Sequence, residues 1–250
     1  MESNSNPVAS EIVVRQCSSL ADFDRCVELQ RTIWHYADVD VVPTAVMVVA
    51  DKSGGHVLGA FDGKTMIGFA LGFAAFHAGT PYVHSHMAAV LPEYRNRGIA
   101  RQLKLFQREI CLRSGIDLVE WTFDPLELKN AHFNIVRLGV LVRKILPNLY
   151  GITSSQLHGP LPTDRLVAEW AIVSPRVENV LAGRRTPGRE VVARVTLPAN
   201  IVELKQSDPE AARREQTRAR EEFQRLFSEG LVVTGFEGGE ETASYLLGTL

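Results

Sequence analysis

Residues 84–104 constrain the fold of this chain more than any other stretch. They are typical of a buried strand, a tight glycine turn and the opening of a helix. Backbone N–H groups in a turn that runs directly into a helix point one way, and the helix end adds a positive partial charge. The stretch therefore predicts a site where a pyrophosphate binds without a dedicated side chain. We call residues 95–101 the cradle.

Two small residues make the cradle suitable for an anion. Gly98 lets the backbone approach a phosphate closely or adopt a positive φ, and Ala100 keeps the helix start open to a ligand. An ordinary strand-to-helix turn is the alternative interpretation. The cradle lacks the Lys-Ser/Thr pair of a Walker loop and the G-x-G-x-x-G run of a dinucleotide-binding fold. Its members are Arg95, Asn96, Arg97, Gly98, Ile99, Ala100 and Arg101.

The composition is that of an ordinary globular protein, with 45% hydrophobic residues, 22% charged residues and a net charge of −2. Outside the cradle the arginines are dispersed among acids, so we expect no nucleic-acid partner. Three cysteines without C-x-x-C spacing imply neither a disulfide framework nor a metal site. The longest apolar stretches, such as residues 66–76, are about half the ~20 residues of a membrane-spanning helix. Residues 1–11 lack the features of a signal peptide, so we expect a cytoplasmic protein without a membrane partner.

At 250 residues the chain has room for one large domain or two small ones. We expect a flexible tail over residues 1–11, a core over residues 12–150 and a C-terminal extension over residues 151–250, packed on the core. Apolar patterning predicts core strands at residues 12–16, 46–50, 57–61, 65–76, 82–91 and 117–123, and core helices from Ser19, over residues 98–115 and over residues 126–141. The extension is expected to hold strands at residues 166–173, 190–197, 231–236 and 243–247, an exposed loop at residues 174–189, and a charged helix capped by Ser207 and ending near residue 229.

The order helix, antiparallel meander, strand, cradle, helix, strand and helix resembles the GNAT superfamily of acyl-CoA-dependent N-acyltransferases. The core motif of that superfamily is Gln/Arg-x-x-Gly-x-Gly/Ala, and Arg95, Gly98 and Ala100 match its three positions. The resemblance covers residues 12–150 and implies an α+β (mixed α/β) fold. Its central mixed sheet has splayed parallel fourth and fifth strands and flanking helices, to which this chain adds a strand-helix-strand extension. Acetyl-CoA or another acyl-CoA is implied as cosubstrate, with no metal.

The chemistry of this superfamily also needs a way to deprotonate the attacking ammonium. His84 and His86 lie two apart on the strand before the cradle, so both side chains point to one face. Arylalkylamine N-acetyltransferases of the superfamily carry a His-x-His at the same offset, which implies a general base or a water relay here. The alternative is that both are hydrogen-bonded strand residues at the edge of a splayed sheet. The resemblance implies that the pantetheine arm runs along the main chain of Met87, Ala88, Ala89 and Val90, where one amide polarises the thioester carbonyl.

The family pattern next expects an asparagine after the fifth strand and, about two turns on, a tyrosine that protonates the leaving thiolate. Asn130 matches the asparagine and joins the implied cofactor-binding residues. The tyrosine position falls near Ile135, so the general acid is missing there. Tyr150 is a candidate replacement, and water is another.

Residues 121–127, with the sequence WTFDPLE, resemble a subgroup known only as predicted acetyltransferases, relatives of which are suspected to N-succinylate amino acids. We expect this block where the parallel strands separate and the substrate meets the thioester. Asp124 and Glu127 are candidates to hold a substrate ammonium, although Glu127 equally suits a helix start. Trp121 and Asn134 complete the candidate substrate-binding residues.

The leading hypothesis is an N-acyltransferase that moves an acetyl or succinyl group from acyl-CoA to the amine of a small molecule, such as an amino acid. Direct attack is expected, because no histidine pairs with Cys111 to activate it as a nucleophile. The alternatives are a catalytically weak acyl-CoA-binding or regulatory module and a protein or peptide N-acetyltransferase. Residues 151–250 are expected to shape an acceptor pocket, to pair with a second subunit in a homodimer, or both. Asp164 and Arg165 fit a carboxylate-binding pair or, as we favour, a turn with a surface ion pair.

Overall fold

The structure, a computed structural model, describes residues 11–151, 161–184 and 190–250. All but the last residue of the expected tail over residues 1–11 lies outside the described residues. The described residues form one ten-stranded mixed sheet with helices on its faces. This confirms the predicted mixed α/β fold.

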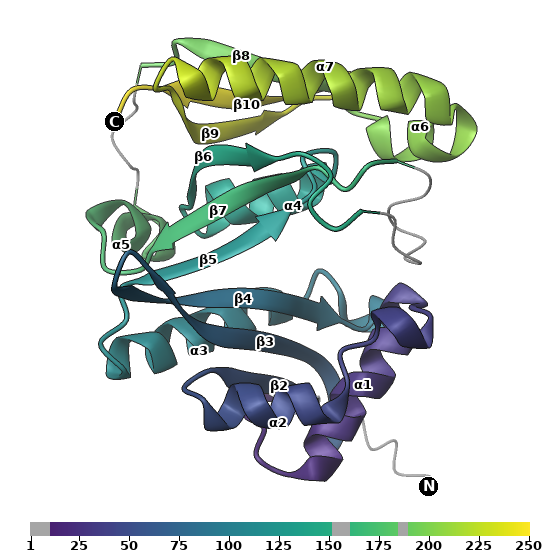
Figure 1. The fold of residues 1–250 in the computed structure, drawn as a ribbon, viewed down its shortest axis with the longest axis vertical. Coiled ribbons are helices and arrows are strands. Elements are labelled where there is room, and N and C mark those ends of the chain that lie inside the picture. The colour runs from purple at the N-terminus through teal and green to yellow at the C-terminus, as the bar shows by residue number, and fades with distance from the viewer. Residues whose placement is uncertain (1–10, 152–160, 185–189) are drawn as a thin grey trace, which may run out of the picture.

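The strands follow one another along the long axis of the molecule, from the N-terminal half to the C-terminal half (Figure 1). Their order across the sheet is β1-β2-β3-β4-β5-β7-β6-β9-β10-β8. Because β7 lies between β5 and β6, the sheet is continuous across residue 150. The strands are β1 (Ile12–Gln16), β2 (His56–Asp62), β3 (Thr65–His77), β4 (Thr80–Val90), β5 (Leu118–Phe123), β6 (Leu141–Leu146), β7 (Arg165–Ala171), β8 (Ala193–Pro198), β9 (Val232–Gly238) and β10 (Thr242–Gly248).

Helices cover both faces of the N-terminal half of the sheet (Figure 1). α1 and α2 pack on one face against β2 and β3, and α3 packs on the opposite face against β2, β3 and β4. The long helix α7 packs against β6 and β8 in the C-terminal half. The helices are α1 (Leu20–Trp34), α2 (Thr44–Lys52), α3 (Ile99–Arg113), α4 (Leu128–His132), α5 (Pro175–Leu181), α6 (Ile201–Ser207) and α7 (Pro209–Ser228).

The parallel strands β4 and β5 separate soon after they meet. Two register pairs join them, Val83 with Val119 and His84 with Glu120. Beyond these pairs no ladder joins the two strands among the described residues, while β3 and β7 continue to pair on their outer sides. The structure therefore has the splayed parallel pair that the sequence predicts.

A β-bulge in β4 lies at the point of separation. Met87 pairs with Leu71 of β3, and Ser85 pairs with the next residue, Gly72, so His86 is the extra residue of the bulge. Gly72 is required opposite the bulge, because a Cβ there would lie 2.6 Å from Nε2 of His56. Bulges re-aim side chains and occur often beside active sites. Here the bulge removes His86 from the β3 ladder at the edge of the separation.

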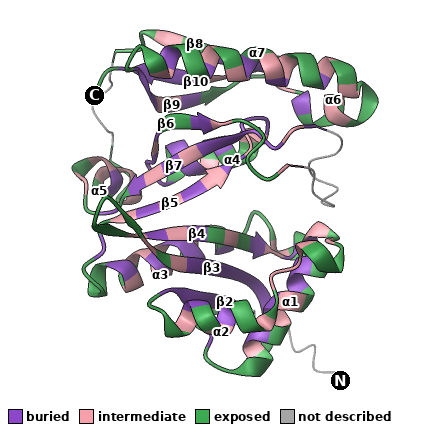
Figure 2. Cartoon of the chain, viewed as in Figure 1, coloured by how far each residue is buried: buried purple, intermediate pink, exposed green. Residues whose placement is uncertain are grey.

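The hydrophobic core divides at the same place. One cluster of buried residues joins α1, α2 and the start of α3 to β2 and β3, and the other joins β5 to all later strands. Figure 2 shows the corresponding buried surfaces of the sheet on both sides of the separation. The C-terminal cluster also includes Val83 of β4 and Cys111 of α3, so the two parts share apolar contacts where β4 and β5 still pair. Beyond that point each part of the sheet packs on its own cluster.

The strand predicted at residues 46–50 is wrong, because these residues lie in helix α2. Met47 and Ala50 are buried three residues apart on one helix face, while Val46 and Val49 are exposed. β-Branched residues favour strands, but β-propensity is weak beside the burial of a helix face on the sheet.

The helix predicted over residues 126–141 is shorter in the structure. It consists of α4 and a π-helical turn over Phe133–Arg137, and the chain then turns directly into β6. Val142 and Ile145 of β6 are buried, and a short apolar run of this kind fits a buried strand as well as a buried helix. The sequence prediction missed β6 for that reason.

Two predictions in the extension are also wrong. The exposed loop expected at residues 174–189 contains helix α5, whose N-terminus is capped when Ser174 accepts a hydrogen bond from the backbone N–H of Val177; residues 185–189 of that loop lie outside the described residues. The cap of the charged helix α7 is Asp208, which accepts from the N–H of Ala211, whereas Ser207 ends the preceding helix α6. Aspartate and serine are nearly equal N-caps, so adjacent candidates are hard to separate by sequence.

Candidate functional site

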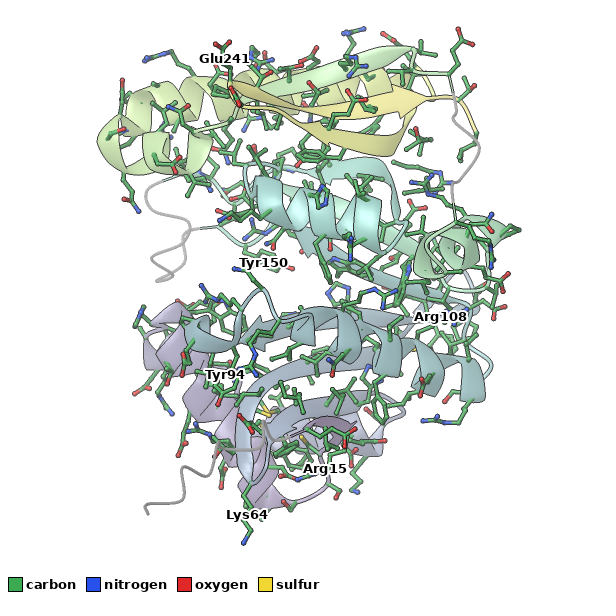
Figure 3. The ribbon with its side chains drawn as sticks, turned by 180° about the vertical axis from the view of Figure 1, so that it is seen from behind. Arg15, Lys64, Tyr94, Arg108, Tyr150 and Glu241 are labelled. Carbon is green, nitrogen blue, oxygen red and sulfur yellow. The ribbon has the colours of Figure 1, made fainter. Side chains whose placement is uncertain are left out.

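A cleft of about 520 Å³ opens where β4 and β5 separate. Tyr150 lies where the two halves of the sheet separate (Figure 3). The predicted site residues that line the cleft are His86, Met87, Ala88, Ala100, Trp121, Asp124, Glu127, Asn130, Asn134 and Tyr150. Lining residues that the motif reasoning missed include Trp34, Tyr36, Asp40, Ser85 and Lys104. The structure therefore brings the strand before the cradle, the helix after it and the WTFDPLE block into one cavity.

The cradle has the geometry of an anion site. Gly98 is the N-cap of α3 with φ of +78°, and no side chain caps the helix there. An added Cβ at Gly98 would meet nothing within 4 Å, so the space above the turn is open. Asn96 also has a positive φ, which turns the chain sharply before the helix. No side chain therefore caps the first amides of α3, which is the arrangement of a helix start that can bind an anion.

The three cradle arginines differ in what they contact. Arg95 Nε donates to the carbonyl oxygen of Val90 at 3.3 Å, and the guanidinium of Arg97 lies 5.0 Å from the ring centre of Tyr94. Both arginines are exposed. Arg101 Nη2 donates to the carbonyl of Leu181 at 3.0 Å and so ties α3 to α5. Arg95 and Arg97 are therefore the better placed of the three to meet phosphates from solvent.

The strand residues before the cradle divide between the cleft and the core. Met87 and Ala88 line the cleft, whereas Ala89 is buried against β3 and Val90 is half-buried. The expected run of pantetheine contacts along residues 87–90 thus has two members in the cleft lining.

The two histidines of β4 are neighbours with different access to the cleft. Their ring centres are 6.0 Å apart, and His86 lines the cleft while His84 stays outside its lining. Partial desolvation in the cleft lowers the pKa of His86, although this residue remains exposed to solvent. Burial, together with the charges of His86 and Lys104, lowers the pKa of His84. Both imidazoles are therefore mainly neutral at pH 7, as a proton acceptor must be.

Lys104 extends from α3 to the floor of the cleft and is 5% exposed. Its Nζ donates to Ser85 Oγ at 2.8 Å and to Gln107 Oε1 at 3.1 Å, and lies 3.8 Å from the ring centre of Trp121. Burial lowers the pKa of Lys104 to about 7. The amide nitrogen of Gln107 lies 2.7 Å from His56 Nε2, so it donates to that nitrogen and keeps the imidazole neutral.

The buried His56 predicts how stability depends on pH. Burial lowers its folded-state pKa to about 4, while the unfolded chain keeps the ordinary value of 6.5. The unfolded state then binds more protons between these values, so acidification from pH 6.5 towards pH 4 removes stability, by ~3 kcal/mol at most. Urea titrations measure the free energy of unfolding across this pH range. Between pH 6.5 and pH 4 we expect the His56→Gln variant to lose less of it than the wild type, by ~3 kcal/mol. The exposed His77→Gln variant should match the wild type, and identical acid losses in the wild type and His56→Gln would contradict this assignment.

The acidic candidates for substrate binding are already paired within the protein. Lys205 Nζ, from α6, lies 3.0 Å from Asp124 Oδ2 and 3.0 Å from Glu127 Oε1. Burial opposes the charge of Lys205, but the two carboxylates outweigh it and raise the pKa of the lysine. The ammonium that these acids hold in the structure is therefore the chain's own, and their role is to join the extension to the WTFDPLE block.

The cleft lining also includes a buried arginine. Arg165, at the start of β7, is 7% exposed, lines the cleft and lies 5.5 Å from the ring centre of Tyr150. Asp164 is buried too and accepts from the backbone N–H of Asn148 at 2.9 Å. The favoured interpretation of these two residues as a surface turn is therefore wrong, because both are buried. Arg165 Nη1 donates to the carbonyl oxygen of Asp164 at 3.3 Å. The dipeptide Asp164-Arg165 was too short a sequence pattern to decide between a carboxylate-binding pair and a surface turn.

No tyrosine occupies the expected general-acid position. Ile135 is buried in the core there. The Tyr150 hydroxyl is 3.0 Å from Thr122 Oγ1 on β5, at the same end of the cleft as Arg165.

A sheet that splays beside a bulged strand, followed by a glycine cradle at a helix N-terminus, defines the class of acyl-CoA-dependent N-acyltransferase folds. Residues 23–133 match the acetyltransferase (GNAT) family. The match covers 111 of the 250 residues, so it shows a GNAT-type acetyltransferase domain within this chain. A search of curated protein sequences finds no match.

Solved structures show the same fold at low sequence identity. The chain is similar to the ribosomal-protein-S18-alanine N-acetyltransferase from Escherichia coli, with 11% identity and a TM-score of 0.52 over 66% of this chain and 97% of that one. It is similar to a chain of the NatC complex bound to Gag peptide and CoA, with 18% identity and a TM-score of 0.52 over 65% and 99%. Arabidopsis thaliana Naa50, in complex with the bisubstrate analogue CoA-Ac-MVNAL, has 15% identity and a TM-score of 0.50 over 65% and 98%.

No group of three or more His, Cys, Asp or Glu residues is placed to hold a metal ion within residues 11–151, 161–184 and 190–250. In the same ranges, no helix has the length and apolar character needed to cross a membrane.

Proposed function

We propose that this protein moves an acetyl or succinyl group from acyl-CoA to the amine of a small molecule that carries a carboxylate, such as an amino acid. The observation that carries the proposal is the continuity of one cleft from Ala100 beside the cradle, past His86, to Arg165. When bound, acyl-CoA supplies the activated thioester. His86 accepts a proton from the incoming amine, and an amide of Met87 or Ala88 polarises the thioester carbonyl.

Arg165 supports a carboxylate on the acceptor. Its guanidinium is buried among the cleft residues, and Tyr36 and Tyr150 lie close enough to interact with it electrostatically. A planar guanidinium binds carboxylates through paired hydrogen bonds, more strongly in a partly desolvated site. Trp34 and Trp121 line the same cleft and offer apolar contacts to a side chain.

We further propose that residues 12–150 form the catalytic core and that the extension, residues 151–250, completes the acceptor side. The extension contributes Arg165 from β7 and, through Lys205 of α6, restrains Asp124 and Glu127. In addition, Tyr245 of β10 donates to the carbonyl of Pro125 at 2.7 Å.

A CoA-release assay tests this function. Acetyl-CoA and succinyl-CoA are each combined with amino acids, with the matching amines that lack the carboxylate, and with a short peptide. We expect turnover to be fastest with amino acids. The Arg165→Gln variant should raise KM for the amino acid by about 10-fold, the cost of one charge-assisted pair, and leave KM for the matching amine unchanged.

The control is Arg194→Gln, an exposed arginine of β8 that pairs with Glu237. This variant should behave as the wild type with both acceptors. Equal changes in KM for amino acid and amine in Arg165→Gln would reject a carboxylate-binding role. Tight CoA binding without turnover on any acceptor would favour the binding-module alternative, and turnover restricted to the peptide would favour a peptide acetyltransferase.

A further inference from the structure

The buried Lys104 has no role in the motif that identifies the family. Lysine is rarely buried without an opposite charge, because removing an ammonium from water is costly. Within the described ranges no carboxylate pairs with Lys104; its polar contacts are Ser85, Gln107 and the ring of Trp121. The ammonium of Lys104 therefore gives up a proton more readily than that of an exposed lysine.

The three contacts place Nζ where the strands separate. Ser85 belongs to β4 and Trp121 to β5, so the ammonium bridges the two strands just beyond their last register pair. Ala100 lies one helical turn before Lys104 on the same face of α3, and both line the cleft. A thioester that extends from the cradle towards His86 therefore passes close to Nζ.

We propose that Lys104 donates the proton to the sulfur that leaves from CoA. The inference rests on the proposed function. Lys104 takes the general-acid role that the family pattern gives to a tyrosine. At the expected tyrosine position Ile135 is buried in the core, and Tyr150 lies with Thr122 and Arg165 at the proposed acceptor end.

In the acyl transfer, every proton that moves is supplied or accepted by Lys104, His86, the substrates or solvent. The amine nitrogen forms a bond to the acyl carbon, the carbon–sulfur bond breaks, and its electron pair stays on sulfur. Lys104 Nζ gives one proton to that sulfur and becomes a neutral amine, while the surplus proton of the nitrogen passes to His86. Solvent returns a proton from His86 to Lys104 after the products leave, so no other reactant is needed.

The groups around Lys104 suit this direction of transfer. Its titratable neighbours are His56 of β2, His84 and His86 of β4, and Cys111 of α3. The three histidines have lowered pKa values and burial raises the pKa of Cys111 to about 11, so all four are mainly neutral near pH 7. Burial holds the pKa of Lys104 at about 7, below the value of about 8.5 for an ordinary thiol. Proton transfer to a thiolate is therefore downhill.

The test measures the thiol of CoA bound to the protein. The ultraviolet absorbance of the thiolate is followed against pH for CoA bound to the wild type, with desulfo-CoA as the blank. The variant Lys104→Met keeps a chain of similar length without the charge, and Arg113→Met removes an exposed charge at the far end of α3 as a control. The two groups titrate as a coupled pair, so with a coupling of about one unit we expect about 5-fold more thiolate at pH 7 in the wild type and Arg113→Met than in Lys104→Met.

Turnover provides a second readout. Lys104→Met should lower kcat with acetyl-CoA by about 100-fold, and the defect should shrink with an acetyl thioester of a more acidic thiol, which leaves without a proton. A bound thiol that titrates at the same pH in the wild type and Lys104→Met would overturn the proposal and leave the proposed function standing. Failure of the wild type to bind CoA at all would overturn both.

Discussion

The Gly98→Asp variant is expected to bind CoA about 100-fold more weakly than the wild type. Gly98 is the N-cap of α3, and the space above it, where we propose that the pyrophosphate binds, is open. A carboxylate there would occupy the amides of the first helical turn and repel the phosphates. Like charges brought together cost several kcal/mol, and about 1.4 kcal/mol corresponds to each tenfold loss of affinity. Isothermal titration calorimetry with CoA measures the effect.

The matched control for this variant is Gly115→Asp. Gly115 follows the other end of α3, has φ of +68° and also has nothing within 4 Å of an added Cβ. Aspartate tolerates positive φ, so both variants should fold, with a modest loss of stability that thermal unfolding reports. Gly115→Asp should bind CoA as the wild type does. If the two variants lose affinity equally, the cradle is a structural turn and the pyrophosphate binds elsewhere.

His86→Gln is expected to lower kcat/KM by about 100-fold or more, the usual contribution of a general base. Glutamine preserves a polar side chain at the bulge, so CoA affinity should stay the same. His84→Gln should have a much smaller effect, because His84 stays outside the cleft lining. Steady-state kinetics of the two single variants and of the double variant separate their contributions. Unchanged turnover in the double variant would remove both histidines from the mechanism.

The pH profile gives an independent check of His86. Partial desolvation lowers the pKa of His86 below the ordinary 6.5. The neutral, proton-accepting imidazole is therefore present above the lowered pKa and disappears as the pH falls through this value. We expect kcat/KM of the wild type to decline on the acid side with a pKa below 6.5. The decline should be absent from the residual activity of His86→Gln. An acid limb of the same shape in the variant would assign it to another group.

The cradle was predictable from sequence because its conformation is local. A turn that enters a helix through a left-handed residue needs glycine at Gly98, whatever the rest of the chain does. The motif that begins at Arg95 therefore predicted the family. The bulge at His86 was not predictable in the same way, since it depends on the register between β3 and β4. The two histidines looked equivalent in sequence, and only the structure separates them.

The buried face of α3 was predicted only in part. Ile99 and Leu103 belong to the expected apolar stripe and are buried, but Lys104 and Gln107 are buried as well. Helical spacing shows which residues share a face and not what covers that face. Because β4 and β5 separate beneath the helix, Lys104 lines the cleft there, whereas Gln107 is buried against His56.

The sequence by itself predicted the mixed α/β class, and the resemblance of its motif predicted the GNAT-type domain that residues 23–133 match. The motif could be found in the sequence because turn chemistry acts over a few residues. Tertiary structure alone decided which residues of the C-terminal half reach the cleft. Arg165 reaches the cleft because β7 inserts beside β5, and Lys205 reaches Asp124 from α6. These partners are far apart along the chain, and their contacts follow from how separate elements pack, which no local pattern encodes.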